Sequence, residues 1–385
     1  MPDPITLRGI TWDHDRGLRP LLATAEAYAG REPGVRVEWR VRSLQAFADQ
    51  DVASLAARFD LVVLDHPSIG FAVERGCLAP LDERLDDGFL RDQEANSVGR
   101  SFESYGWGGR LWALAVDAAA QVASYRPDLL ARVEAVVPET WDQVVELASA
   151  ARAAGMSVAI PCIPVDAVLA YCAGAVADGN DPFSGERAAR GRALERLRRL
   201  VELAHPDSTA WNPPRTYEHM ASSDDVVYCP LGFGYSNYSR VDYRDRVLSF
   251  APAPAGSAGA RVGTLGGAGL AVSASSPNVD AAVAYAAFVA SPETQRGMYV
   301  REQGQPGHRS AWLDDAANDM TRGYFRDTLS GLDAAYLRPR HAGFLEFQDR
   351  AGEVVHAYLA AGGDPLDAVG RLDAIDAETR GSFGS

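Results

Sequence analysis

The stretch that decides the fold class covers residues 9–41 and is GITWDHDRGLRPLLATAEAYAGREPGVRVEWRV. A β-forming run ends at Trp12, apolar residues then recur at helical spacing over 18–28, and apolar and polar side chains alternate over 35–41. Recurrence every three to four residues predicts a helix, whereas strict alternation predicts a half-buried strand. The stretch therefore predicts strand, helix and strand, which is the repeating unit of an α/β protein with parallel strands.

The same alternation of elements continues along the chain. Residues 43–59 are expected to form a second helix and residues 60–66, DLVVLDH, a fully buried strand. A second α/β set follows, with helices expected over 138–155 and 166–179 and strands over 156–160 and 225–230. Because 385 residues exceed one ordinary hydrophobic core, we expect more than one domain.

Composition excludes several classes of function. The formal net charge is -15, which disfavours nucleic acid and anionic membranes as partners. All 37 basic side chains are arginine, so a lysine Schiff base and a Walker-A lysine are excluded. The spacing of the four cysteines matches no zinc template, so neither a metal nor a cofactor is expected.

Two features bear on the location of the protein. No apolar run approaches the roughly 18 residues of a membrane-spanning helix, so we expect no membrane insertion. The first residues, MPDPITLRGITW, lack the basic and apolar regions of a secretory signal. The expectation is a cytoplasmic protein, and an extracellular one only if an export segment has been trimmed.

Polar side chains follow two of the expected strands directly. Asp13 and His14 come after the first strand, and Asp65 and His66 end the buried one. Ligands of α/β sheets bind beyond the carboxyl ends of the strands, so both Asp-His pairs are candidates for one binding edge. The alternative is structural: an aspartate that caps a helix, or a histidine satisfied in a buried turn.

Aromatic residues recur at the expected loop ends. They are Trp12, Trp112, Trp211, Tyr228, Phe233 and Tyr235. Aromatic faces beside aspartate and arginine suit sugars and other flat polar organic molecules, because rings stack and charged groups orient hydroxyls. The alternative for each aromatic residue is packing in the core.

Four stretches together resemble the family-1 solute-binding proteins of ABC transporters. They are FDLVVLDHPSIGFAVERGCLAPLDE (59–83), YGWGGRLWALAVDAAAQVASYRPDLL (105–130), PETWDQVVELASAAR (138–152) and GGAGLAVSASSPNVDAAVAYAAFVASPETQRG (266–297). These stretches resemble that family's motifs in the same order and span nearly the whole chain. Each motif is loose alone, whereas the set is specific for the fold and not for the ligand.

The resemblance implies a two-lobed α/β fold of the type II periplasmic-binding-protein class, with an interlobe cleft and a hinge. The first lobe would comprise 1–116 plus 263–311, and the second 117–262 plus 312–385 with the C-terminal helices. By matching position, the residues implied to face a ligand are Trp12, Asp13, His14, Arg16, Ser43, Asp65, His66, Asp117, Trp211, Tyr228, Tyr235, Gly266 and Gly267.

Two functions remain open from the sequence. The first is a monomeric clamshell that binds a small polar molecule, hydroxylated or aromatic, with an ABC permease as partner only if the protein is exported. The second is a cofactor-free cytoplasmic enzyme on the same fold, an isomerase, dehydratase or cyclase. In the enzyme, His14 or His66 would carry the proton because histidine titrates near neutral pH. Neighbouring strand-end side chains diverge, so the orienting carboxylate would come from the other strand end, Asp65 for His14 or Asp13 for His66.

Overall fold

The computed structural model describes residues 5–49 and 51–381. The chain divides into two compact units. Unit 1 consists of Met1–Ala119, Gly266–Met320 and Pro339–Ala342, and unit 2 consists of Ala120–Leu265, Thr321–Arg338 and Gly343–Ser385. The expected lobes differ from these units at their edges. In particular, residues 117–119 and 312–320 belong to unit 1 and not to unit 2.

Unit 1 is built on strands β2 (Val35–Arg42), β1 (Ile5–Trp12), β3 (Leu61–Leu64) and β10 (Leu265–Val272), in that order. The first three strands are parallel, and β10 runs antiparallel to β3. Helix α1 (Asp15–Arg31) connects β1 to β2, which confirms the strand–helix–strand expectation for residues 9–41. The carboxyl ends of β1, β2 and β3 therefore lie at the same edge of this sheet.

The helix expected over 43–59 is wrong as a single element. The structure has α2 (Leu44–Asp49) and α3 (Val52–Ala56) in its place. Asp51 begins the second helix, because its carboxylate accepts hydrogen bonds from the backbone N–H groups of Ala53 and Ser54 at 3.0 and 3.2 Å. An N-cap of this kind fixes where a helix starts.

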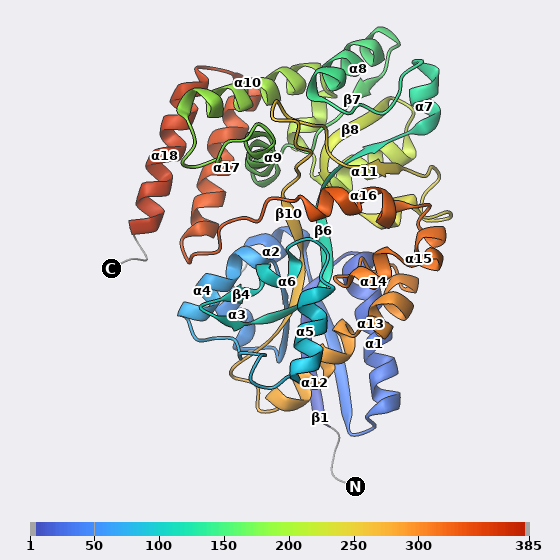
Figure 1. Ribbon diagram of the computed structural model, residues 1–385, viewed down its shortest axis with the longest axis vertical. Helices are drawn as coiled ribbons and strands as arrows, with labels where there is room; N and C mark the ends of the chain where they lie inside the picture. The colour runs from blue at the N-terminus through green and yellow to red at the C-terminus, as the bar shows by residue number, and fades with distance from the viewer. Residues whose placement is uncertain (1–4, 50, 382–385) are drawn as a thin grey trace. The chain divides into compact units, whose positions relative to one another are not determined.

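The remaining elements of unit 1 surround this sheet (Figure 1). They are η1 (His66–Ser68), α4 (Ile69–Glu74), α5 (Asp87–Ala95), α6 (Ser101–Ser104), the hairpin β4 (Gly106–Trp107) and β5 (Arg110–Leu111), α12 (Val279–Ala290), α13 (Pro292–Thr294), η4 (Gln295–Tyr299), α14 (Arg309–Trp312) and α15 (Asp315–Met320). Side chains from β1, β3, β10, α1 and α12 form one hydrophobic core. Strand β6 (Ala113–Tyr125) belongs to unit 1 in its first half and to unit 2 in its second half.

Unit 2 has its own strands and core. Strand β8 (Val226–Phe233) lies between the second half of β6 and the short β7 (Ser157–Val158), and β9 (Ser249–Ala251) pairs with β6. Its helical elements are α7 (Pro127–Arg132), α8 (Trp141–Ala153), α9 (Pro164–Ala177), α10 (Arg187–Leu203), η2 (Pro206–Ala210), α11 (Pro213–Ser222), η3 (Ser236–Ser239), α16 (Tyr324–Asp333), α17 (Phe344–Ala361) and α18 (Pro365–Gly381).

Helix α9 forms the centre of the helical part of unit 2. It is buried over most of its circumference, and α10 and α17 lie beside it (Figure 1). A helix that is apolar all round is typical of a protein core. Helix α8 begins at the expected place, because Thr140 and Gln143 form a capping box.

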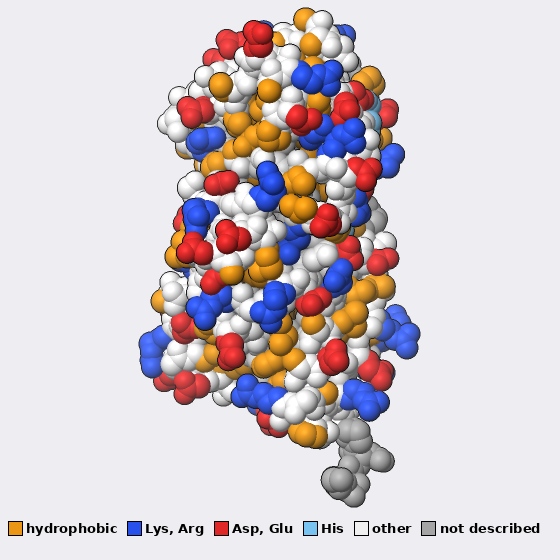
Figure 2. Space-filling model, turned by 90° about the vertical axis from the view of Figure 1, so that its right-hand side faces the viewer, with side chains coloured by type: hydrophobic (Ala, Val, Ile, Leu, Met, Phe, Trp, Pro, Cys, Tyr) orange, Lys and Arg blue, Asp and Glu red, His pale blue; other side chains and the backbone are white. Residues whose placement is uncertain are grey.

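The surface carries charges of both signs. Acidic and basic side chains are interspersed over the face drawn in Figure 2. Among the described residues, no helix has both the length and the apolar character needed to cross a membrane.

Candidate functional site

The candidate site in unit 1 is the sheet edge formed by the carboxyl ends of β1, β2 and β3. Asp13, Ser43 and Asp65 directly follow these three strands. The backbone N–H of Asp13 donates to the carbonyl of Arg42 at 2.8 Å, which ties the loop after β1 to the end of β2. The structure therefore brings together the strand-end side chains that the sequence predicted to share an edge.

The crowded turn after β1 serves partly to begin a helix. His14 is the N-cap of α1, since its Nδ1 accepts a hydrogen bond from the backbone N–H of Arg16 at 3.0 Å. Asp13 is exposed and His14 half-buried, so both side chains reach solvent at this edge. The helix is therefore capped by His14 and not by the aspartate that the structural alternative named, which leaves the Asp13 carboxylate exposed at this edge.

Trp12 lies in the core of unit 1. Its side chain is only 4% exposed, and its ring contacts Phe47 with ring centroids 5.2 Å apart. The indole also covers Gly17, where a Cβ atom would come within 2.4 Å of the ring. The tryptophan offers little surface to a solute in this conformation, and its predicted stacking on a ligand stays a prediction.

Arg16 and Asp117 form a buried ion pair within unit 1. Nε of Arg16 donates to Oδ2 of Asp117 at 2.7 Å, and the terminal nitrogen Nη2 donates to Oδ1 at 2.5 Å. Both side chains are nearly inaccessible to solvent. Burial raises the pKa of Asp117, although the Arg16 guanidinium opposes this rise. Two residues expected to orient a ligand therefore bind each other.

The second Asp-His pair departs from expectation. His66 is fully buried and begins η1, and its Nδ1 lies 3.1 Å from Oδ1 of Asp65. The expectation that these neighbouring side chains diverge is therefore wrong, because the chain turns into a 3-10 helix at this point instead of continuing as a strand. Asp65 retains 28% exposure of its side chain, whereas His66 is inaccessible to solvent.

The glycines at the start of β10 allow a close backbone approach. Gly267 has φ +107°, and a Cβ atom there would lie 2.4 Å from the carbonyl oxygen of Asp117. Gly266 is buried beside it in the same strand. Their predicted contact with a ligand is untested, and their structural role is to let β10 pass close to Asp117.

The predicted residues of unit 2 are buried aromatic side chains. Trp211 packs against the rings of His205 and His219, with centroid distances of 4.6 Å to each. Tyr228 lies in the unit 2 core, and its hydroxyl has no hydrogen-bond partner among the described residues. The Tyr235 ring contacts Tyr217. Core packing accounts for these three side chains in this structure, and their role in binding stays a prediction.

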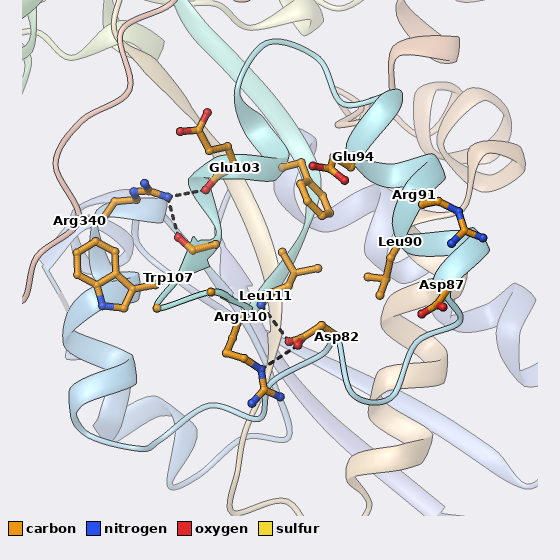
Figure 3. Close-up of a pocket in the computed structure, with 14 residues that line it drawn as sticks. Asp82, Asp87, Leu90, Arg91, Glu94, Glu103, Trp107, Arg110, Leu111 and Arg340 are labelled. Carbon is orange, nitrogen blue, oxygen red and sulfur yellow. Dashed lines mark hydrogen bonds and ion pairs between the residues drawn. The ribbon is translucent and has the colours of Figure 1, made fainter.

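Unit 1 also contains a pocket of about 600 Å³ that no sequence pattern predicted (Figure 3). It lies between α5 and the β4–β5 hairpin, and it is lined by Asp82, Asp87, Leu90, Arg91, Glu94, Phe102, Glu103, Gly106, Trp107, Gly108, Gly109, Arg110, Leu111 and Arg340. Arg110 pairs with Asp82 and Glu83 at 2.8 and 2.5 Å. Gly108 and Gly109 form the two-residue turn of the hairpin, and both have positive φ. A Gly-Gly pair in the sequence indicates such a turn, but it does not indicate the pocket beside it.

None of the residues predicted to bind a ligand lines this pocket. Arg340, at its rim, donates to the carbonyl oxygens of Glu103 and Gly106 at 2.5 and 2.8 Å. Several charged side chains that line the pocket thus form ion pairs or hydrogen bonds within unit 1. The strand-end edge and the pocket are separate features of the same unit.

Residues 13–296 match the family of bacterial extracellular solute-binding proteins. This match covers well over half of the chain. The chain belongs to that family. No curated protein matches it.

Solved structures show the same fold along the whole chain. Maltose-bound MalE3 of T. maritima superposes with a TM-score of 0.85 at 20% identity, covering 98% of this chain and 100% of that one. A solute-binding protein of Agrobacterium radiobacter K84 in complex with ribitol gives 0.83 at 19% identity, covering 99% of both chains. The GacH receptor of Streptomyces glaucescens, solved without ligand and with acarbose, gives 0.81 at 18% identity and 99% of both. The two-lobed periplasmic-binding-protein fold is confirmed.

Proposed function

We propose that this protein binds a small, uncharged, polyhydroxylated molecule, a sugar or a polyol, and that its two units close around it. The ligand would be held by hydroxyl hydrogen bonds to the strand-end edge of unit 1. The unit 2 aromatic residues Trp211, Tyr228 and Tyr235 would face it only after a conformational change, since they are buried here.

The observation that carries this proposal is the set of acceptors at one edge of the unit 1 sheet. Asp13, Ser43 and Asp65 follow three adjacent parallel strands, and each side chain is exposed or half-buried. Carboxylate and hydroxyl oxygens are suitable acceptors for sugar hydroxyls, and charge-assisted hydrogen bonds are the stronger kind. Arg16 is already neutralised by Asp117, so its charge does not favour an anionic solute.

The related structures support the chemical class. They contain maltose, ribitol and acarbose, which are all rich in hydroxyl groups. With identities of 18–20%, they do not specify which sugar or polyol this chain takes.

The proposal is tested by isothermal titration of the full chain with maltose, ribitol and acarbose. We expect at least one to bind, and Asp65→Asn to weaken that binding about tenfold, the scale of a lost charge-assisted hydrogen bond. In the wild type, Oδ1 of Asp65 accepts a hydrogen bond from the backbone N–H of His66 at 2.9 Å. The asparagine side chain keeps this oxygen, so we expect the local fold to be retained. The matched control is Asp87→Asn, an exposed aspartate of the same unit, which should bind as the wild type. If no member of the panel binds, or if both variants bind equally, the proposal fails.

The enzyme hypothesis is tested in the same samples. Mass spectrometry of the recovered solute distinguishes binding from turnover, and we expect the solute to be returned unchanged. His66 is inaccessible to solvent and His14 caps a helix, so neither is poised to carry a proton in this structure. The predicted location inside the cell is a separate matter, which cell fractionation with an antibody against the protein would test.

A further inference from the structure

Three metal-binding side chains converge in unit 2, beside α11 and the start of β8. His205 follows α10, His219 lies in α11, and Asp225 directly precedes β8. Nε2 of His219 lies 2.9 Å from Oδ1 of Asp225, and Nε2 of His205 lies 3.6 Å from Oδ2 of the same carboxylate. The three residues each offer one ligand atom, and these atoms all lie within 4.8 Å of one another.

The two imidazole rings and the Trp211 indole pack against one another, and the imidazole centroids lie 5.0 Å apart. The Trp211 ring stacks on His205 at 4.6 Å and 17°, and it lies 4.6 Å from His219 at 37°. Trp211 is itself buried, and its carbonyl accepts a hydrogen bond from the backbone N–H of Cys162 at 3.0 Å. Fixed rings cost less to order when a ligand binds, so the cluster is preorganised.

The Asp225 carboxylate is held in place by two neighbouring side chains, those of Ser223 and His219. The Ser223 hydroxyl donates to Oδ1 at 2.5 Å. Such second contacts orient a ligating carboxylate and tune its metal affinity.

We propose that His205, His219 and Asp225 form a binding site for a zinc ion. Zinc takes imidazole nitrogen and carboxylate oxygen at about 2.0–2.2 Å in a tetrahedron, which spaces neighbouring ligand atoms by roughly 3.3 Å. Nε2 of His219 lies 2.9 Å from Oδ1 and Nε2 of His205 lies 3.6 Å from Oδ2, so each imidazole is close to this spacing from one oxygen of the carboxylate. One ligand atom from each residue lies within 4.8 Å of the others, so small side-chain shifts bring the set onto one ion. The side chains of His205, His219 and Asp225 are 18, 24 and 44% exposed, so an ion can enter and water can supply the fourth ligand.

The choice of metal follows from the donor set. Two imidazoles and one carboxylate suit zinc, whereas magnesium and calcium prefer oxygen ligands throughout. No zinc-binding spacing is visible in the sequence, because the three residues come from different elements and no cysteine takes part. The expectation that the protein holds no metal rested on cysteine spacing, which is not informative for such a site.

One contact opposes the site and limits its affinity. Nδ1 of His205 accepts a hydrogen bond from the backbone N–H of Asp207 at 3.2 Å. Zinc on Nε2 requires the proton on Nδ1, so this long hydrogen bond must be given up. Nδ1 of His219 has no hydrogen-bond partner among the described residues, so nothing opposes the same tautomer there.

The test is titration of ZnCl₂ into the full, tag-free, chelator-treated chain at pH 7.5, with MgCl₂ as a second titrant. We expect one zinc ion per chain with a dissociation constant in the micromolar range or below, and no magnesium binding. His219→Gln and Asp225→Asn should each weaken zinc binding at least about tenfold. His356→Gln is the control, because this histidine of α17 bonds to the carbonyl of Cys162, outside the cluster, and it should bind zinc normally.

Cobalt substitution gives a readout that does not depend on the variants. Co²⁺ in the site should show the intense visible absorption of a four-coordinate ion, and excess chelator should abolish it. The proposal is overturned if zinc shows no saturable binding, if His219→Gln and Asp225→Asn bind zinc as the wild type does, or if only the octahedral cobalt spectrum appears. The zinc proposal is independent of the sugar proposal. Neither the zinc titration nor the cobalt spectrum changes the result expected from titration with maltose, ribitol and acarbose.

Discussion

The Arg16–Asp117 pair is the residue-level feature with the largest expected effect on stability. Removing one partner of a buried ion pair leaves the other charge in a poorly solvated place, which costs about 3–5 kcal/mol. We therefore expect Asp117→Asn to lower the free energy of unfolding by that amount, measured by urea denaturation of the full chain.

The control for this prediction is an exposed pair in the same unit. Arg100 and Glu103 lie 2.5 Å apart with about half of each side chain exposed. Such surface pairs contribute less than about 1 kcal/mol, so Glu103→Gln should change little. Equal effects of the two substitutions would contradict the assignment of Arg16–Asp117 as a buried structural pair.

Asp166 supplies a second prediction, about pH. It lies in the first turn of α9, its Oδ2 has no hydrogen-bond partner among the described residues, and burial raises its pKa to about 8. Between about pH 4 and 8 the folded protein keeps this proton while the unfolded chain loses it. Stability should therefore fall as the pH rises, by at most about 1.4 kcal/mol per pH unit from this group.

The measurement compares urea denaturation of wild type and Asp166→Asn at pH 5.0 and pH 7.5. The amide does not titrate, so the variant should lose less stability over this interval than the wild type. Parallel pH profiles for the two proteins would show that Asp166 is ionised in the folded state.

At the scale of elements, Gly267 in β10 is a position that has no room for a side chain. Its positive φ and the 2.4 Å approach of a Cβ atom to the Asp117 carbonyl both oppose alanine. Backbone strain of this kind costs about 1–3 kcal/mol, and the clash adds to it. Thermal unfolding should show Gly267→Ala to be clearly destabilised. Gly34→Ala, where a Cβ atom meets nothing within 4 Å, should be neutral or slightly stabilising.

Helices and strands with strong hydrophobic periodicity were predictable from the sequence, whereas the breaks within such periodic stretches were not. The helix after β1 and the helix from Thr140 both show the apolar periodicity in the sequence, and Thr140 also marks where its helix begins. The break between α2 and α3 depends on Asp51 using its side chain as a cap, a choice that competes with continuing the helix. Val41 shows a similar limit: it follows the alternation of β2, yet it is exposed, because β2 is an edge strand.

The candidate site was predictable in its position more than in its contacts. Parallel strands bring Asp13, Ser43 and Asp65 to one edge, as the order of elements implies. The pairing of Arg16 with Asp117, 101 residues apart, depends on tertiary structure that no local pattern carries. The same holds for the pocket beside α5 and for the cluster around Trp211, each of which is assembled from distant segments.

At the scale of the molecule, the chain combines two units, each with its own hydrophobic core, in the fold of the solute-binding proteins. The chain passes between the units five times, after Ala119, Leu265, Met320, Arg338 and Ala342. Two compact units joined by short connections suit hinge closure, in which a ligand binds both units. The central claim is therefore that the protein works as a clamshell.

Small-angle X-ray scattering tests this claim most directly. The full chain is measured alone and saturated with whichever of maltose, ribitol and acarbose binds in the titration. The account predicts that the radius of gyration decreases on saturation, because the two units close. An unchanged radius of gyration, at a concentration where calorimetry shows the site to be full, would contradict it.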